Sequence, residues 1–317
     1  MKIKFSMIDK ELRTTGRVIK VINNTFTEPK LRLLGKMKFR MRMKDDTINF
    51  SEEWISRKNG SKLRICIYKP IAPKVNVPGV LWSHGGGYAI GVPERAKGMA
   101  KRLIEVSDCV VIAPDYRLSV EAPYPAALED SYEALLWMKN HAEELGIRSD
   151  QLMVGGDSAG GGLTAALSLY ARDKGEVKIA FQMPLYPMLD DRMTSDSAVE
   201  NNAPVWNSKS NYNAWKLYLG ERFGMPDVPV YAAPARAEDY RNLPPTATFV
   251  GALEPFRDET IEYVDHLRKA GVPVDFEVFE GCYHAFEQMC PKAEVSRKAM
   301  TFLLNAYEYA VMHHFTE

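Results

Sequence analysis

The sequence predicts an α/β fold in which a mostly parallel central sheet carries helices on both faces. Three observations support this prediction. Short apolar runs alternate with helical segments over most of the 317 residues, a hairpin signal precedes the alternation, and a glycine-rich junction joins a strand to a helix near the middle. Because parallel strands need crossover connections, such alternation is typical of a sheet that is covered on both faces.

The expected elements follow in chain order. Residues 1–45 look mainly helical, and two strands at 53–57 and 63–68 flank Asn59-Gly60, a strong hairpin signal. Further strands are expected at 79–82, 109–113, 151–154, 178–183, 246–250 and 274–279. Helices are expected at 95–106, 126–145, 159–171, 259–270 and 292–313. Residues 190–224 break this rhythm and contain Trp206, Tyr212, Trp215 and Tyr218.

Composition excludes several classes of protein. The formal net charge is zero, so nothing global favours nucleic acid or an acidic surface as a partner. Eleven Lys or Arg between positions 10 and 44 face two Glu, and we interpret them as a solvated helical face rather than a membrane or nucleic-acid patch. The longest uncharged stretch, 75–93, contains two prolines and five glycines, which is wrong for a membrane-spanning helix.

The N-terminus and the four cysteines bear on the cellular compartment of the protein and on whether it binds a metal. The first ten residues lack the apolar run and cleavage site of a secretory signal, so we do not expect export. The cysteines show no metal-like pairing, and Cys66 and Cys109 lie in apolar strand-like runs as small buried hydrophobes. We therefore predict a cytoplasmic protein without a metal site.

The junction at 155–162 carries the first candidate catalytic residue. Ser158 lies in Gly-x-Ser-x-Gly between the strand at 151–154 and the helix that follows. In this pattern a strained turn lifts the serine hydroxyl above the sheet, and glycines flank it because a Cβ would collide where the helix passes the strand. Ala159 opens the helix, so its free N–H points to where an oxyanion would form.

A second glycine-rich loop, His84-Gly85-Gly86-Gly87, follows the strand at 79–82. Consecutive glycines can turn their N–H groups into an anion-binding concavity. A phosphate loop is the natural competitor, but its Gly-Lys-Ser/Thr ending is missing. Placed before Gly-x-Ser-x-Gly, this motif is typical of the oxyanion loop of esterases, to which Gly86 and Gly87 would contribute N–H groups together with Ala159.

Order along the chain selects the remaining partners, since the serine is followed by the acid and then by the histidine. Among six histidines, His284 is the one placed on a loop after a strand and beyond Ser158. The strand at 246–250 delivers Glu254, our predicted acid. Asp258 is the alternative acid, although its position fits a helix N-cap better.

These blocks together resemble the hormone-sensitive-lipase family of bacterial carboxylesterases. The resemblance runs from about residue 50 to the C-terminus and includes Asp115-Tyr116-Arg117-Leu118, the segments at 122–127 and 254–259, and the two glycine-rich loops. It implies an α/β-hydrolase domain at 46–317, with a helical cap formed by residues 1–45 and an insertion at about 190–224. The aromatic residues of the insertion are equally consistent with a local core. The acid motif of the family usually begins with Asp, where this chain has Glu254.

The resemblance implies a serine carboxylesterase that hydrolyses short-chain acyl esters without a metal or organic cofactor. The expected partner is a small-molecule ester, with neither nucleic acid nor stable membrane insertion, and a homodimer is compatible with the family. Two alternatives stay open. One is an amidase or peptidase that uses the same triad, and the other is a non-catalytic member that binds a small molecule.

Overall fold

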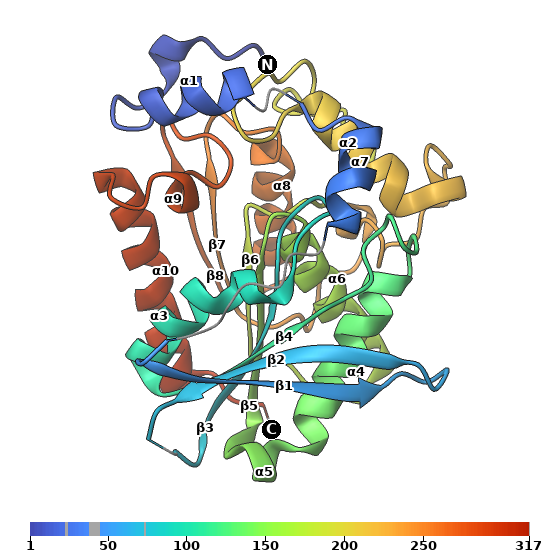
Figure 1. Ribbon diagram of the computed structural model, residues 1–317, viewed down its shortest axis with the longest axis vertical. Helices are drawn as coiled ribbons and strands as arrows, with labels where there is room; N and C mark the ends of the chain where they lie inside the picture. Colours follow the sequence, from blue (N-terminus) through green and yellow to red (C-terminus); the bar gives the residue numbers. More distant parts are fainter. Residues whose placement is uncertain (23–24, 38–44, 73, 317) are drawn as a thin grey trace.

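The computed structural model describes residues 1–22, 25–37, 45–72 and 74–316, and its core is one eight-stranded sheet with helices on both faces (Figure 1). The spatial order of the strands is β1-β2-β4-β3-β5-β6-β7-β8. Their bounds are β1 Ile48–Ser56, β2 Lys62–Pro70, β3 Val77–Ser83, β4 Val110–Pro114, β5 Ile147–Asp157, β6 Phe181–Leu185, β7 Thr246–Gly251 and β8 Val274–Phe279.

The predicted hairpin is present. β1 and β2 pair antiparallel, β2 pairs antiparallel with β4, and the strands from β4 to β8 are parallel neighbours. Residues alternate along β2 and β3 between two apolar clusters, with Ile65 and Leu81 in one and Cys66 and Trp82 in the other. The sheet therefore separates two cores, as the sequence predicted.

Helices cover the sheet on both sides. The longer ones are α1 Arg13–Ile22, α2 Glu28–Lys36, α3 Lys97–Ser107, α4 Ala126–Asn140, α6 Ala159–Lys174, α7 Ser208–Leu219, α8 Arg257–Lys269 and α10 Glu294–His313. The short ones are α5 Ala142–Leu145, α9 Phe286–Met289 and the 3-10 turns η1 Phe5–Met7, η2 Pro93–Ala96, η3 Gly220–Arg222 and η4 Pro234–Arg236. The prediction of a single helix at 126–145 is wrong in one respect. The segment is divided into α4 and α5 at His141, whose backbone leaves the helical region.

The N-terminal helices lie at the same end of the molecule as α7, the helix of the irregular 190–224 segment (Figure 1). The backbone N–H of Phe26 donates to Ser210 Oγ over 2.9 Å, and Lys216 pairs with Glu28 at 3.1 Å. The expected helical character of the N-terminus is confirmed for α1 and α2, whereas residues 38–44 lie outside the described chain. That these helices act as a cap remains a prediction.

Two glycines allow the N-terminal helices to lie close to the rest of the fold. A Cβ on Gly35 of α2 would lie 2.3 Å from the carbonyl oxygen of Ala89, just beyond the His84–Gly87 loop. A Cβ on Gly16 of α1 would lie 3.1 Å from the ring of Tyr283. Both helices therefore rest on loops that adjoin the predicted site residues.

Candidate active site

The turn between β5 and α6 holds Ser158 in a conformation that few side chains adopt. Its backbone lies at φ 59° and ψ −119°, outside the ordinary regions for a non-glycine residue. A Cβ on Gly156 would lie 2.4 Å from the carbonyl oxygen of Gly160, and one on Gly160 would lie 2.0 Å from that of Ser83. Both flanking positions therefore require glycine, which is the steric reason expected from the sequence.

The structure brings Ser158, His284 and Glu254 into one chain of hydrogen bonds. Ser158 Oγ lies 2.8 Å from His284 Nε2, and His284 Nδ1 lies 2.5 Å from Glu254 Oε2. The other carboxylate oxygen of Glu254 accepts from the N–H of Gly251 at 2.8 Å. The three side chains are almost fully buried, with residue exposures of 5%, 3% and 0% in that order.

The three residues come from the carboxyl ends of different strands of the parallel part of the sheet. Ser158 follows β5, Glu254 lies three residues beyond β7, and His284 lies on the loop after β8. Since parallel strands end at the same edge, residues 126 positions apart, such as Ser158 and His284, become neighbours there. This arrangement allows a carboxylate to fix the imidazole tautomer while Nε2 accepts the serine proton.

Asp258 does not take part in the chain of hydrogen bonds that links Ser158, His284 and Glu254. Its expected position at a helix N-cap is also wrong. The residue at the N-cap of α8 is Phe256, so Asp258 belongs to the first helical turn. Its carboxylate accepts from the N–H of Ser197 at 2.7 Å and from Arg257 Nε at 2.7 Å. These hydrogen bonds lower the pKa of Asp258, against the effect of burial. Its contacts thus tie α8 to the segment before α7.

The glycine loop lies against the nucleophile turn. A Cβ on Gly85 would lie 3.2 Å from the Cβ of Ser158. Gly86 and Gly87 both have positive φ, at 127° and 59°. A Cβ on Gly86 would lie 2.0 Å from the carbonyl oxygen of Ile90, so glycine is required there. Within the described chain, no hydrogen bond satisfies the N–H groups of Gly86, Gly87 or Ala159, which leaves them available to an oxyanion.

His84 supports this loop rather than the proton transfer. Its Nδ1 lies 2.9 Å from the carbonyl oxygen of Gly85, its ring stacks on Tyr116 at 4.3 Å, and the Tyr116 hydroxyl donates to the carbonyl of His84 over 2.7 Å. Burial lowers the pKa of His84 to about 4. The imidazole is therefore neutral at neutral pH and acts as a rigid part of the loop.

Aromatic rings enclose His284. Tyr186 and Phe256 meet its ring edge-on at centroid distances of 5.0 and 5.2 Å, and Trp206 lies at 6.3 Å. Trp206 also fills the space beside the glycine loop, since a Cβ on Gly87 would lie 2.5 Å from its ring. The site is consequently compact and largely shielded from water.

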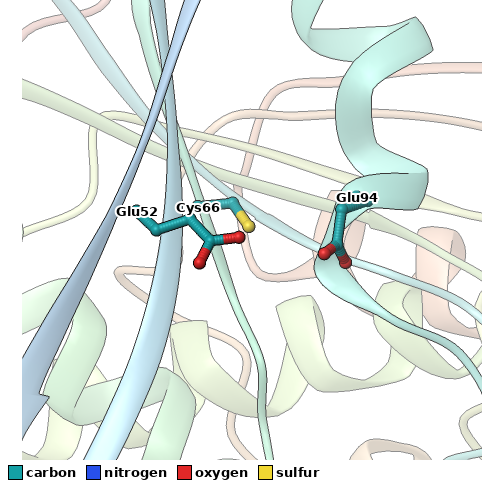
Figure 2. A group of neighbouring side chains, drawn as sticks. All are labelled: Glu52, Cys66 and Glu94. Atoms are coloured by element: carbon teal, nitrogen blue, oxygen red, sulfur yellow. The ribbon is translucent and has the colours of Figure 1, made fainter. Parts of the chain in front are cut away.

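Glu52, Cys66 and Glu94 form the one group of potential metal ligands found among the described residues (Figure 2). The Arg64 guanidinium already occupies their centre, with 2.8 Å contacts from Nη1 to both glutamates and 3.0 Å from Nε to Asp115. Burial raises the pKa of the Cys66 thiol to about 12, so it is protonated at neutral pH. We interpret this group as a buried ion-pair network, and the absence of a metal site stays a prediction.

Sequence reasoning missed Arg64 and the residues behind His284. Arg64 lies in an apolar strand run, and its acidic partners come from β1, η2 and the loop after β4. Tyr186 and Glu287, which are hydrogen-bonded to each other, lie 101 residues apart. The available signal was the charge itself: a lone Arg or Glu within an otherwise apolar context needs a buried partner.

In the ranges that the structure describes, none of the helices is both long and apolar enough to cross a membrane.

The chain is similar to known proteins in family, in sequence and in structure. A family model described as the alpha/beta hydrolase fold matches residues 80–288. Esterase LipI of Mycobacterium tuberculosis is 35% identical over 69% of this chain and 69% of its own length. The arylesterase of Saccharolobus solfataricus is 34% identical over 71% of this chain and 73% of its own length.

Among solved structures, a bacterial heroin esterase superposes with a TM-score of 0.86 at 35% identity, covering 97% of this chain and 99% of that one. These relatives are named esterases. The span that the family model matches, 80–288, includes both glycine-rich loops, Ser158, Glu254 and His284. The chain is therefore a carboxylic ester hydrolase that belongs to the hormone-sensitive-lipase family of the α/β-hydrolase fold.

Proposed function

We propose that the chain hydrolyses short-chain acyl esters through an acyl-enzyme intermediate formed on Ser158. The observation that carries this proposal is the continuous chain of hydrogen bonds from Ser158 Oγ through His284 to Glu254. Nucleophile, base and orienting acid within hydrogen-bond reach are the minimum that serine acyl transfer needs.

The reaction proceeds in two halves. Ser158 Oγ attacks the ester carbonyl while His284 Nε2 takes its proton, and Glu254 stabilises the resulting imidazolium. The N–H groups of Gly86, Gly87 and Ala159 bind the tetrahedral oxyanion. His284 then protonates the leaving alcohol. A water molecule, deprotonated by the same imidazole, repeats the attack on the acyl-enzyme and releases the acid.

The preference for short acyl chains is supported by the crowding around the site. Trp206 lies against Gly87 and near His284, and Tyr88 stacks on Tyr218 at 3.7 Å directly after the glycine loop. These rings are buried and leave little room for a long chain. A cytoplasmic location, which we also propose, is supported by four cysteines that are all free thiols.

The test is hydrolysis of p-nitrophenyl esters from acetate to a long-chain acyl group, with Ser158→Ala beside the wild type. Ser168→Ala is a matched control, since Ser168 is a buried serine on α6, ten residues beyond the nucleophile. We expect activity that peaks at short chains, disappears in Ser158→Ala and survives in Ser168→Ala. Turnover that peaks at long chains would contradict the proposed acyl preference, and activity retained in Ser158→Ala would contradict the proposed nucleophile.

An amidase remains the second candidate, because the same three residues cleave amides. Turnover of p-nitroanilide substrates, measured beside the esters, would show whether the enzyme also cleaves amides.

A further inference from the structure

A buried carboxyl group that the mechanism does not use lies directly behind the predicted base. Glu287 belongs to α9, one helical turn beyond His284, and is 4% exposed. Its Oε1 accepts a hydrogen bond from the Tyr186 hydroxyl. Its Oε2 has no hydrogen-bond partner among the described residues. Because an unpartnered buried carboxyl oxygen is costly, this group calls for an explanation.

Tyr186 connects this carboxyl group to His284. The Tyr186 ring packs edge-on against the imidazole, with an interplanar angle of 78°, while its hydroxyl donates to Glu287. Gln288 Nε2 donates to the same hydroxyl over 2.9 Å, which fixes its orientation toward Glu287. Burial raises the pKa of Tyr186 well above its ordinary value, so the phenol stays a neutral donor. The contact between Glu287 and the base is therefore mediated by one rigid ring.

Glu287 lines a cleft of about 260 Å³, which is also bordered by Asp157, the residue before the nucleophile. Arg95 and Arg102 line it as well and are exposed to solvent. The cleft thus gives water access to Glu287, and Ser158, Glu254 and His284 are not among its lining residues.

Several titratable groups face Glu287 from the elements around it. They are Asp157 at the end of β5, Tyr186 after β6, Cys282 and His284 on the loop after β8, and Arg95 and Arg102 of η2 and α3. Burial raises the pKa of the Cys282 thiol, which keeps it protonated. Burial also raises the pKa of Glu287 to about 7, with the Tyr186 hydrogen bond opposing this effect. Glu287 therefore changes its charge within the working range of an esterase.

We propose that Glu287 is a positioning residue that acts on His284 through Tyr186. As a carboxylate it holds the Tyr186 ring against the imidazole and stabilises the imidazolium, and it exchanges its proton with water in the cleft that it lines. The proposal rests on the role proposed above for His284. No bond of Glu287 to substrate is involved. Its proton passes to cleft water as the pH rises above about 7, and the negative charge that remains favours a positive imidazole.

The test compares kcat/KM of the wild type and Glu287→Gln for p-nitrophenyl acetate from pH 5.5 to 8.5. At pH 5.5 the wild-type Glu287 is protonated and resembles Gln, so the two rates should be nearly equal. At pH 8.5 the wild-type carboxylate is charged, and we expect the variant to be slower by about 10-fold, which corresponds to a loss of about 1.4 kcal/mol in the stabilisation of the transition state. A ratio that does not change with pH would overturn the proposal, because a purely structural role would lower both ends alike.

Glu259→Gln is the matched control. Glu259 is also buried, and its Oε1 accepts from the N–H of Leu189 at 2.7 Å. Its hydrogen bonds come from the backbone N–H groups of Leu189 and Asp190 rather than from Tyr186 or His284, so Glu259→Gln should leave the ratio flat. Glu287→Asp, which keeps a titratable group, should restore part of the pH-dependent rate.

Two further variants distinguish a failure of this proposal from a failure of the proposed function on which it rests. If Glu287→Gln fails to fold, Tyr186→Phe provides the same test, since it removes the hydroxyl that links the two groups. Its rate relative to wild type should likewise fall as the pH rises. Full activity in His284→Ala would refute the proposed function itself, whatever the pH profile of the Glu287 variants.

Discussion

Replacing Glu254 by aspartate, the residue with which the acid motif of the family usually begins, is expected to impair this enzyme. The Glu254 carboxylate reaches His284 Nδ1 at 2.5 Å and is held from behind by the N–H of Gly251. Removal of one methylene retracts the carboxylate by about 1.3 Å. The contact would then exceed about 3.5 Å, which is too long for a hydrogen bond. Loss of the orienting acid in such a triad costs about 10⁴-fold in kcat.

Glu254→Asp keeps the charge near the imidazole and lets the loop relax in part, so we expect a loss of about 30- to 1,000-fold in kcat, or roughly 2 to 4 kcal/mol. Glu254→Gln should lose about 10⁴-fold, because it favours the wrong tautomer. Both are measured as kcat on p-nitrophenyl acetate, with thermal unfolding as the check on folding. A wild-type kcat in Glu254→Asp would refute the geometric argument, and a large loss in Asp258→Asn would move the role of the acid to Asp258.

Three predictions concern stability, each measured by urea unfolding. Gly35→Ala should lower the free energy of unfolding by about 1 to 3 kcal/mol, since its Cβ would lie 2.3 Å from the Ala89 carbonyl oxygen, whereas Gly98→Ala, with open space around it, should be neutral or stabilising by about 0.5 kcal/mol. Arg64→Met should lower the free energy of unfolding by about 3 to 5 kcal/mol, because it leaves buried carboxylates without their positive partner. A smaller loss would mean that these carboxylates become protonated or hydrated. The pKa of His84 is about 4 in the folded protein against an ordinary 6.5. The neutral ring therefore contributes about 3 kcal/mol to the free energy of unfolding above pH 6.5, and this contribution is lost as the pH falls toward 4. A His84→Gln variant whose stability depends on pH as that of the wild type does would contradict this.

The parts that could be predicted from the sequence are those with local causes. Strand–helix alternation, the Asn59-Gly60 turn and the glycines around Ser158 depend on backbone sterics within a few residues, and each is found where it was expected. The order of serine, acid and histidine along the chain selected three residues that the structure brings within hydrogen-bond distance, although their catalytic roles stay predictions.

The parts that were missed depend on distant partners. The sequence predicts a helix N-cap at Asp258, but the N–H of Ser197, 61 residues away, binds its carboxylate, and the helix begins at Arg257, two residues earlier than expected. β5 begins at Ile147 rather than at position 151, because Ile147 pairs with Val77 on the neighbouring strand. Glu287 has no local pattern that marks it, since its environment is formed by Tyr186, just after β6, and by Asp157 at the end of β5.

The position of β8 has a consequence for how the enzyme fails. β8 is an edge strand, paired with β7 alone in the sheet, and most of its residues are partly exposed. The loop that it supports carries His284, while Ser158 is anchored on the interior strand β5. The nucleophile thus rests on the most cooperative part of the molecule and its base on a part that can fray locally. On heating, the loop that carries His284 should therefore unfold first and reversibly, while Ser158 stays in place. The enzyme should lose its activity at this stage, before the sheet as a whole unfolds.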